Sequence, residues 1–422
     1  MGAAVPEREV EVVVRIGGED VLAGHLWSHR RRGRESATFA YATEYLTRPG
    51  AYALDPALPL MKGQQQTAAG RAMFGAFTDC APDRWGRKLI LRREREHRDG
   101  ADGERGLGEV DFLLGVRDDL RQGALRFRDP EHGAFLAAEE AGVPQLVDLP
   151  ARLAAAERVE LDEADDDDLA MLIHGGSSLG GARPKAHVLE ASGQPAIAKF
   201  PSPAHDEWDV MRWEAVALAL AREAGIVVPE ARLVDVEGRA VLVLERFDRV
   251  GGERVGYVSA MTMLEATDGE AGSYLDIADT IETHSPAASA DLRQLWRRIA
   301  FSILISNTDD HLRNHGLLHR AAGWSLAPAF DLNPDPRTGP KHLSTAIDFE
   351  DTEADVDTLL SVAPEFRLRP EDARRTLAEV AEATADWRRV AERHGLAPAA
   401  QAQMSTAFEQ EQGERAAAIV SA

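Results

Sequence analysis

Apolar and polar residues alternate along most of the first 130 positions, which is the spacing of half-buried β-strands. Residues 8–27 alternate around a Gly-Gly pair and predict a β-hairpin, and residues 36–46 and 123–127 predict two further strands. Residues 70–97 have helical spacing instead, with an interruption at Pro82, a residue that can begin a second helix. The pattern therefore predicts an α+β unit that ends near residue 130.

Helices and short strands are expected in turn along the next part of the chain. Residues 131–170 are rich in Ala and Glu and are predicted to be helical. A glycine-rich stretch over 174–185 follows, and we expect one strand before it and two after it, separated by a turn at Ser192-Gly193. Residues 205–225 then predict an amphipathic helix that ends in a glycine cap.

The second half of the chain is predicted to be mostly helical after one more pair of strands. These two strands are expected around Glu237-Gly238, and the second of them, 240–244, is almost entirely apolar, which is typical of a strand buried on both faces. From Met261 onward helical spacing prevails. The expected elements there are a core helix marked by Leu292, Leu295, Ile299 and Ile303, and two further helices over 370–395 and 398–418.

The composition narrows the class of protein. The 422 residues exceed one ordinary core, so we expect two or three structural units. Lysine and arginine total 48 and acidic residues total 71, which gives a net charge of −23. A chain this acidic is a poor bulk binder of nucleic acid, although a local basic patch or a basic partner remains compatible with it.

Cysteine content and targeting signals point to the cell interior. Cys80 is the single cysteine, which excludes an internal disulfide and suits a reducing compartment. The N-terminal segment lacks the features of a secretory signal, and no run of about 18 uncharged apolar residues exists to span a bilayer. We therefore expect a soluble cytoplasmic protein without membrane association.

The residues with the clearest chemistry lie in one polar stretch late in the chain. Asp309 and Asn314 stand five apart in a loop that precedes a predicted hairpin over 316–319 and 324–327, and Asp331 follows that hairpin. In phosphoryl-transfer enzymes of the protein-kinase type, one Asp orients the acceptor hydroxyl, and an Asn and a second Asp at such intervals hold Mg²⁺. The alternative is an ordinary polar surface loop, because Asn and Asp also favour turns.

Two earlier elements fit the same chemistry. The backbone amides of the glycine-rich loop are suited to cradle phosphate oxygens, although the loop matches neither the Walker A nor the G-x-G-x-x-G spacing. Lys199 lies in an apolar strand, where a buried ammonium needs a partner. Glu214 borders the apolar stripe of the following helix, so it either pairs with Lys199, as in kinases, or faces solvent.

Two charged runs have different interpretations. Residues 245–249 follow a buried strand, as the kinase lobe connector does, and the alternative is a central strand that leaves its sheet with charged ends. The run from Asp165 to Asp168 is predicted to start a helix rather than to bind a metal, because four adjacent carboxylates repel each other.

Five motifs occur in order: SSLGGARPKAHV, AIAKFPS, LVLERFDR, NTDDHLRNHGLL and APAFDLNP. With FTDCAPDRWGRKLI and DDLRQGALRF nearer the start, they make the chain resemble the HipA family of serine/threonine kinases, the toxin halves of bacterial toxin–antitoxin pairs. The resemblance extends from roughly residue 8 to residue 390. It implies an α+β, bilobal protein-kinase-like fold. Its expected parts are an extra N-terminal α+β subdomain over 1–130, an N-lobe with the glycine-rich loop over 131–250, and an all-helical C-lobe with the catalytic loop over 251–422.

The resemblance also implies roles for individual residues. Asp309 resembles the catalytic Asp, and Asn314 and Asp331 resemble the Mg²⁺ ligands, although Asp331-Leu332-Asn333 stands where ordinary kinases have Asp-Phe-Gly. Ser178 matches the serine that is autophosphorylated in the family, and Ser177 before it is an alternative. The implied ATP-binding positions are Gly180, Gly181, Ala182, Arg183, Pro184, Lys185, Lys199, Glu214, Glu245, Phe247 and His311, together with Asn314 and Asp331.

The function that the resemblance implies is transfer of the ATP γ-phosphate to a Ser or Thr of a protein target, such as a translation component. It also implies a HipB-like DNA-binding antitoxin that neutralises the chain and contacts operator DNA. The alternatives are a co-repressor scaffold with weak or lost kinase activity, and a kinase for small molecules. Affinity for MgATP separates the scaffold from both kinases, and the identity of the acceptor separates the kinases.

Overall fold

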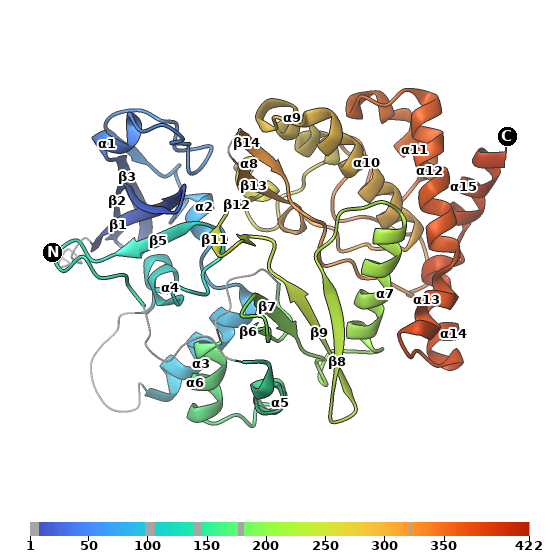
Figure 1. The fold of residues 1–422 in the computed structure, drawn as a ribbon, viewed down its shortest axis with the longest axis horizontal. Coiled ribbons are helices and arrows are strands. Elements are labelled where there is room, and N and C mark those ends of the chain that lie inside the picture. Colours follow the sequence, from blue (N-terminus) through green and yellow to red (C-terminus); the bar gives the residue numbers. More distant parts are fainter. Residues whose placement is uncertain (1–7, 98–105, 138–144, 176–180, 321, 422) are drawn as a thin grey trace. The chain divides into compact units, whose positions relative to one another are not determined.

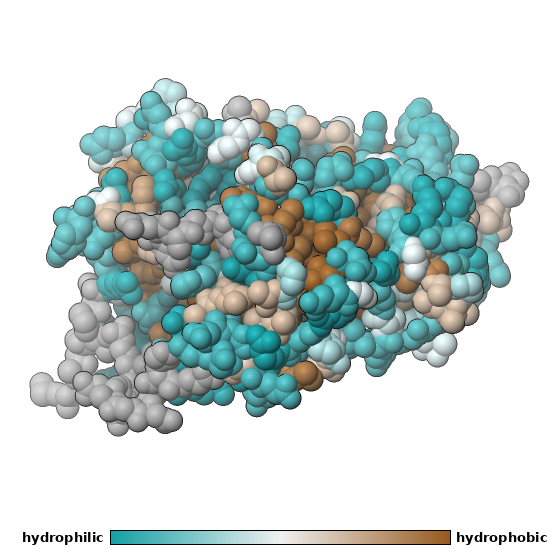
Figure 2. Space-filling view, turned by 60° about the horizontal axis from the view of Figure 1, so that its bottom comes forward, coloured by the Kyte–Doolittle hydropathy of each residue, from teal (hydrophilic) through white to brown (hydrophobic). Residues whose placement is uncertain are grey.

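The structure is a computed structural model and describes residues 8–97, 106–137, 145–175, 181–320 and 322–421 (Figure 1). The chain forms two compact units, residues 1–204 with 248–258, and residues 205–247 with 259–422. Compact units and functional lobes are different divisions of a chain, so the three domains expected from the sequence stay a prediction. Hydrophilic residues make up most of the face shown in Figure 2.

The first unit contains a five-stranded antiparallel sheet in the order β4-β3-β2-β1-β5. Val12, Leu26 and Phe39 are fully buried on its inner face, as alternation along each strand requires. The expected strand over 36–46 ends early, because the chain turns into a short helix after Tyr41. The strands are β1 (Arg8–Ile16), β2 (Glu19–Arg31), β3 (Arg34–Tyr41), β4 (Gln64–Gln66) and β5 (Leu125–Arg128).

Short helices accompany this sheet in the first unit. The interruption expected near Pro82 is present, since the helical stretch is divided into two helices there. The ring of Phe77, in the first of these helices, packs against the core of the sheet. Its centroid lies 5.8 Å from that of Phe39 on β3 and 5.9 Å from that of Phe127 on β5. The helices are α1 (Thr43–Leu46), α2 (Gly75–Asp79), α3 (Arg84–His97) and α4 (Glu109–Gly115).

The stretch after β5 differs from the expectation in two places. The start of the predicted helix over 131–170 forms turns instead of a helix, and Phe135 forms a β-bridge with Arg128. The strand expected before the glycine-rich loop is a helix, because Asp165 accepts a hydrogen bond from the Asp168 backbone and caps it. The elements are η1 (Leu146–Asp148), α5 (Leu149–Glu160), α6 (Asp166–His174) and the hairpin β6 (Lys185–Leu189) with β7 (Pro195–Lys199).

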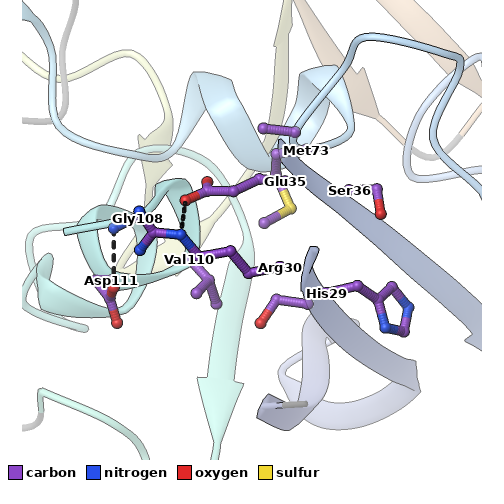
Figure 3. Close-up of a pocket in the computed structure, with 10 residues that line it drawn as sticks. His29, Arg30, Glu35, Ser36, Met73, Gly108, Val110 and Asp111 are labelled. Carbon is purple, nitrogen blue, oxygen red and sulfur yellow. Dashed lines mark hydrogen bonds and ion pairs between the residues drawn. The ribbon is translucent and has the colours of Figure 1, made fainter. Parts of the chain in front are cut away.

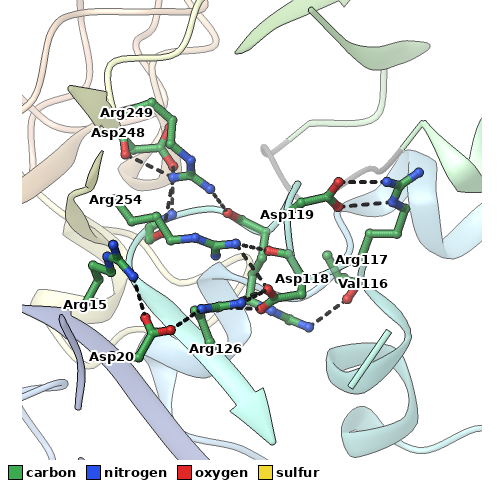
Figure 4. Close-up of polar contacts among 12 residues, drawn as sticks. Arg15, Asp20, Val116, Arg117, Asp118, Asp119, Arg126, Asp248, Arg249 and Arg254 are labelled. Atoms are coloured by element: carbon green, nitrogen blue, oxygen red, sulfur yellow. Dashed lines mark hydrogen bonds and ion pairs between the residues drawn. The ribbon is translucent and has the colours of Figure 1, made fainter. Parts of the chain in front are cut away.

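Residues 248–258 return to the first unit through a network of arginines and carboxylates (Figure 4). Asp118 binds Arg126 at 2.5 Å and also accepts from Arg254 of the returning segment. Asp248 accepts from the backbone N–H of Gly123 at 2.7 Å. The segment contains β10 (Arg249–Val250) and β11 (Glu253–Arg254), and β12 (Gly256–Ser259) follows where the chain passes between units.

The second unit begins with the predicted amphipathic helix, α7 (Val210–Glu223), whose first turn is capped by Asp209. The helix ends as expected, because Gly225 has φ +75° and the backbone N–H of Ile226 reaches back to the carbonyl of Ala221 at 2.9 Å. A hairpin follows, β8 (Ala231–Val236) with β9 (Arg239–Glu245), and β9 is buried through most of its length, as predicted.

The core of the second unit is built on α10 (Ala288–Leu304), whose predicted core residues are at most 1% exposed. Residues 327–355 contain no helix, so the expectation of helix from Met261 onward is wrong over that stretch. Each of the two predicted C-terminal helices is two helices. The elements are α8 (Ala260–Met263), α9 (Tyr274–His284), η2 (Leu312–Asn314), β13 (Gly316–Arg320), β14 (Gly323–Leu326), α11 (Val356–Ser361), η3 (Ala363–Phe366), α12 (Pro370–Ala385), α13 (Trp387–Arg393), α14 (Pro398–Phe408) and α15 (Glu411–Ser421).

Ring stacking explains one of these breaks. Trp387 follows the end of α12 and stacks on Phe408 at a centroid distance of 4.8 Å and an interplanar angle of 9°. A continuous helix would carry this ring in another direction. Within the part of the chain that the structure describes, every helix is too short or too polar to cross a membrane.

Candidate active site in the second unit

The loop between α10 and β13 holds two adjacent aspartates in opposite environments. Asp309 is exposed, whereas Asp310 is 3% exposed. The backbone N–H of His311 donates to the carbonyl of Asp309 at 3.0 Å, and the side-chain amide of Asn314 donates to the same carbonyl at 3.0 Å. Asp309 and Asn314, which were predicted from their spacing, are therefore brought together, although Asn314 is buried and Asp309 is exposed.

The buried carboxylate of Asp310 anchors the loop. Its carboxylate accepts from the hydroxyl of Tyr274 at 2.6 Å and from that of Ser302 at 3.3 Å, and it lies 3.0 Å from Nε2 of His315. Burial raises the pKa of Asp310, but His315 and the Tyr274 hydroxyl outweigh burial and hold this pKa below its ordinary value. The buried carboxylate is thus ionised and ties α9, α10 and the end of the loop together.

A second segment, 341–354, binds the same loop. The backbone N–H and the hydroxyl of Ser344 both donate to the carbonyl of Thr308 at 2.9 Å. Thr345 Oγ1 donates to the carbonyl of Asp310 at 2.7 Å. The carbonyls on both sides of Asp309 are therefore occupied, which restricts the backbone that carries its side chain.

Asp331 lies in a strained turn next to this loop. Its φ is +60°, a region that side chains rarely adopt outside turns and functional sites. Asn333 donates from its side chain to Asp331 Oδ1 at 3.3 Å, and its backbone N–H donates to Asn307 Oδ1 at 3.1 Å. Asn307 belongs to the loop that carries Asp309, so the Asn307–Asn333 bond joins the turn of Asp331 to that loop.

The donor set of this site suits Mg²⁺. Nδ2 of Asn314 donates to the carbonyl of Asp309, so Oδ1 of Asn314 is the atom that could act as a metal ligand, and Asp331 offers a carboxylate. Hard oxygen donors in small number are typical of Mg²⁺, which keeps several waters and binds substrate phosphates. Among the described residues, no three His, Cys, Asp or Glu side chains cluster so as to hold a metal without such help.

The predicted connector reaches the same region of the second unit. Phe247 packs against Phe330, the residue before Asp331, with ring centroids 5.6 Å apart. Glu245 is exposed at the end of β9. Glu214 is 1% exposed on α7, so the solvent-facing alternative for this residue is wrong.

The glycine-rich loop lies in the first unit, where its described part begins at Gly181 with φ +93°. Lys185 is buried on β6, and its ammonium lies 2.6 Å from the carboxylate of Asp83. Asp83 also accepts from the backbone of Gly86 in the first turn of α3, and burial raises its pKa. Ser177, Ser178 and Gly180 lie outside the described residues.

The other predicted residues of the first unit lie close to this pair. Lys199 is opposite Lys185 in the β6–β7 register and is half-buried. Ala182 is exposed and Arg183 is half-buried, while the buried Pro184 accepts a hydrogen bond from Phe200 at 2.9 Å. Lys199 and Glu214 belong to different units, so their ion pair stays a prediction.

Sequence reasoning missed several residues that hold these sites. Asp83 lies in FTDCAPDRWGRKLI, a motif that was recognised as a helix start and as part of the family resemblance, but Asp83 itself was given no role. Asp310 is adjacent to Asp309 and has the same side chain, so no pattern distinguished the buried carboxylate from the exposed one. Asn307 and Asn333 lie inside motifs that were recognised, but neither was given a role, and the available signal was their position beside Asp309 and Asp331.

Comparisons with known proteins identify the family and the fold. The family model of the HipA-like C-terminal domain matches residues 177–387, and that of the HipA N-terminal domain matches residues 14–108. Two proteins of Sinorhizobium fredii, named "Putative kinase Y4mE" and "Putative kinase Y4dM", are 27% and 29% identical over 46% and 34% of this chain. The aligned parts cover 48% and 38% of those relatives, so the chain matches less than half of the length of each.

The solved structures extend the likeness over the whole chain. The HipA protein in a complex described as the Shewanella oneidensis MR-1 toxin–antitoxin system HipA, HipB and its operator DNA has a TM-score of 0.67. It is 15% identical, with 98% of this chain and 99% of that chain covered. The fold is therefore the α+β, protein-kinase-like fold of that protein. With both family models matched in order, the chain belongs to the HipA family.

Proposed function

We propose that this chain is an ATP-dependent serine/threonine protein kinase of the HipA type. The observation that supports this most directly is the pairing of an exposed Asp309 with Asn314 through the Asp309 carbonyl. A carboxylate that is exposed on a loop held from several sides is the arrangement that an acceptor-orienting Asp requires. The turn of Asp331, joined to the same segment, supplies the second oxygen ligand.

Each residue then has a chemical task. Asp309 accepts a hydrogen bond from the Ser or Thr hydroxyl and takes its proton as the oxygen attacks the γ-phosphorus; the bond from the γ-phosphorus to the β–γ bridging oxygen breaks, and ADP leaves. Asn314 and Asp331 hold Mg²⁺, which when bound neutralises charge on the phosphates. Lys199 and the amides of the glycine-rich loop bind the phosphates, and Phe247 with Glu245 borders the adenine. Catalysis is positioning and charge stabilisation rather than covalent chemistry.

The test is phosphate transfer by Asp309→Asn with radiolabelled ATP. We expect transfer to fall at least about a hundredfold, because general acid–base assistance contributes 10²–10⁴-fold. Glu350→Gln removes an exposed carboxylate from the second unit and should leave transfer unchanged. Thermal unfolding of both variants should match the parent chain. Full activity of Asp309→Asn would refute the assignment.

The partners follow from the family. We propose that a HipB-like DNA-binding antitoxin neutralises the chain and that contact with operator DNA is made mainly through it, as the Shewanella complex suggests by its composition. We also propose autophosphorylation at Ser178 or Ser177, the positions that the family resemblance implies. A phosphate there adds about −2 charge to a loop that must hold ATP phosphates, so it should inactivate the chain. Mass spectrometry of the chain after incubation with MgATP should locate the phosphate there and coincide with loss of activity. A phosphorylated loop in fully active protein contradicts this.

The protein target is the remaining unknown. Incubation of a cell extract with the chain and labelled ATP, followed by identification of labelled proteins, should give one that depends on Asp309. A translation component is the expected kind of target. Label on a small molecule instead would support the small-molecule alternative.

A further inference from the structure

The β2–β3 hairpin ends in four arginines within five positions, Arg30, Arg31, Arg32 and Arg34. Only the first has partners in the described part of the chain: its side chain lies 3.8 Å from Glu35 and donates to the carbonyl of Gly106 at 2.8 Å. The other three are exposed, and no hydrogen bond or ion pair of their side chains occurs among the described residues. They form what we term the arginine tip: Arg31, Arg32 and Arg34.

The conformation and charges of the arginine tip destabilise the folded chain. Arg31 and Arg34 are direct cross-strand partners, and like charges at such positions repel. Arg32 has φ +52° and the following Gly33 has φ +76°, the signs that a type I′ turn requires. Asn and Gly are the residues that suit this turn, and a left-handed conformation costs other side chains about 1 kcal/mol or more.

Within the part of the chain that the structure describes, the arginines of the tip are unpaired, and a shortage of carboxylates does not explain this. Elsewhere in the first unit arginines meet acidic partners at short range, such as Arg87 with Glu109 at 2.6 Å and Arg128 with Glu11 at 2.5 Å. The tip has neither these pairs nor any packing role among the described residues. A destabilising local feature that no other contact in the fold explains is expected where a bound ligand interacts with it. The ligand for three adjacent guanidinium groups is a polyanion.

The shape of the hairpin selects the kind of polyanion. The register of β2 with β1 ends at Ser28, and that of β3 with β4 ends at Thr38, so the described residues around 29–36 form a two-stranded ribbon. Neighbouring side chains point to opposite faces of it, as His29 and Arg30 do in Figure 3. Arg31 and Arg34 are direct cross-strand partners, so the ribbon presents them side by side on one face, with Arg32 at its turn. A two-stranded ribbon is the element that the major groove of a duplex admits, with phosphates along both edges.

We infer that the arginine tip binds the phosphate backbone of a nucleic acid duplex, with little selection of sequence. Phosphate contacts from arginine position a protein on a duplex without reading its bases. The net charge of −23 opposes binding over the rest of the surface, so the contact is local and strongly dependent on salt. Duplex binding by the arginine tip requires no nucleotide, metal or phosphate transfer, so it is independent of the proposed kinase activity.

The test is fluorescence anisotropy of the full chain with a labelled 20-base-pair duplex of arbitrary sequence, without ATP, at several salt concentrations. Neutralising three phosphates predicts a slope of log K against log salt of about −2.7, which is about a 40-fold loss of affinity from 50 to 200 mM salt. The variant R31Q/R32N/R34Q should bind at least about tenfold more weakly at 50 mM salt and lose this slope. Its thermal stability should equal or exceed that of the parent, because Asn suits the turn and the like-charge pair is gone.

A matched control separates the tip from total charge. R293Q/R320Q/R374Q removes three exposed arginines of the second unit and changes the net charge equally. It should keep the affinity and slope of the parent chain. Absence of duplex binding at 50 mM salt, or equal weakening in both triple variants, would overturn the inference. Phosphatidylserine vesicles serve as a further arm, and binding of these through the tip as tightly as the duplex would assign it to lipid instead.

Discussion

The side-chain amide of Asn314 donates to the backbone carbonyl of Asp309 at 3.0 Å. This bond uses one end of the amide for positioning and leaves the oxygen end for Mg²⁺. One residue thus couples the proposed ligand set to the backbone that carries the proposed catalytic carboxylate. The two tasks are separable because one needs a nitrogen donor and the other an oxygen.

The substitution Asn314→Asp should separate the positioning of Asp309 from the proposed binding of Mg²⁺. The variant retains an oxygen ligand but loses the donor and places a carboxylate beside a carbonyl oxygen. We expect kcat to fall about tenfold to a hundredfold, since small misplacement of a catalytic group has effects of this order. The apparent affinity for Mg²⁺ should stay within a few-fold of the parent, measured by titrating transfer with Mg²⁺. Asn314→Ala is the control that should lose both, and equal loss of Mg²⁺ affinity in the two variants would count against separate tasks.

The positive φ of Asp331 predicts a conflict between stability and function. Asp331→Gly should relieve a left-handed conformation worth about 1 kcal/mol and raise the unfolding midpoint, unless the lost bond to Asn333 offsets the gain. The same variant should lose phosphate transfer with MgATP because the carboxylate is gone. Asp331→Asn keeps the polar side chain and should leave stability near that of the parent. A Gly variant with full transfer would remove Asp331 from the ligand set.

Patterns with a fixed period predicted much of the fold. The hairpin around Glu237-Gly238, the helix that ends at Gly225 and the core helix with Leu292 and Ile303 were all placed correctly, because turn chemistry and apolar spacing are local. The strand expected over 36–46 is present only as far as Tyr41, and the continuous helices expected in the C-terminal region were wrong. In the latter case the break at Trp387 depends on its stacking with Phe408, a contact that no local pattern contains.

The candidate site was predicted only in part for the same reason. Asp309, Asn314 and Asp331 follow intervals along the chain, so spacing was enough to select them. The residues that hold them do not follow such intervals: Tyr274 reaches Asp310 from 36 positions away, and Lys185 meets Asp83 across 102 positions. Burial distinguishes Asp310 from Asp309, and burial is a property of the packed chain rather than of a single residue.

Asp310→Asn should destabilise the chain more than any exposed substitution. It removes the buried charge that faces the hydroxyls of Tyr274 and Ser302 and Nε2 of His315, and each buried donor left unsatisfied costs about 1–3 kcal/mol. Tyr274→Phe removes only one hydrogen bond to the same carboxylate and should cost about 1–2 kcal/mol. Urea unfolding of both variants at pH 7 measures the difference. Comparable, small losses would mean that the network contributes little to the second unit.

The buried pair of Lys185 and Asp83 offers a double-mutant cycle. Asp83→Asn should destabilise the first unit by about 3–5 kcal/mol, because it leaves a buried ammonium beside a neutral group and weakens the first turn of α3. Lys185→Met alone should be similarly costly, since Asp83 is then buried without a counter-ion. The double variant Asp83→Leu with Lys185→Met should recover much of the loss. Additive losses in the cycle would show that the two side chains act separately.

His319 should make stability depend on pH in the weakly acidic range. It lies opposite Trp324 in the β13–β14 hairpin with ring centroids 5.0 Å apart, and burial lowers its pKa to about 4. The unfolded chain takes up a proton on this ring below its usual pKa of about 6.5, whereas the folded chain does so only below about 4. The stabilisation from keeping His319 neutral is therefore complete above pH 6.5 and is lost as pH falls from 6.5 to 4, by about 3 kcal/mol.

His319→Phe keeps an aromatic cross-strand pair and removes the titrating group. The free energy of unfolding of this variant, from urea curves at pH 7.5, 6 and 5, should fall less with decreasing pH than that of the parent. His342 is exposed, so His342→Gln should retain the slope of the parent chain. An unchanged slope in His319→Phe would show that other groups carry the acid sensitivity, and that the ring of His319 is open to water when the protein is folded.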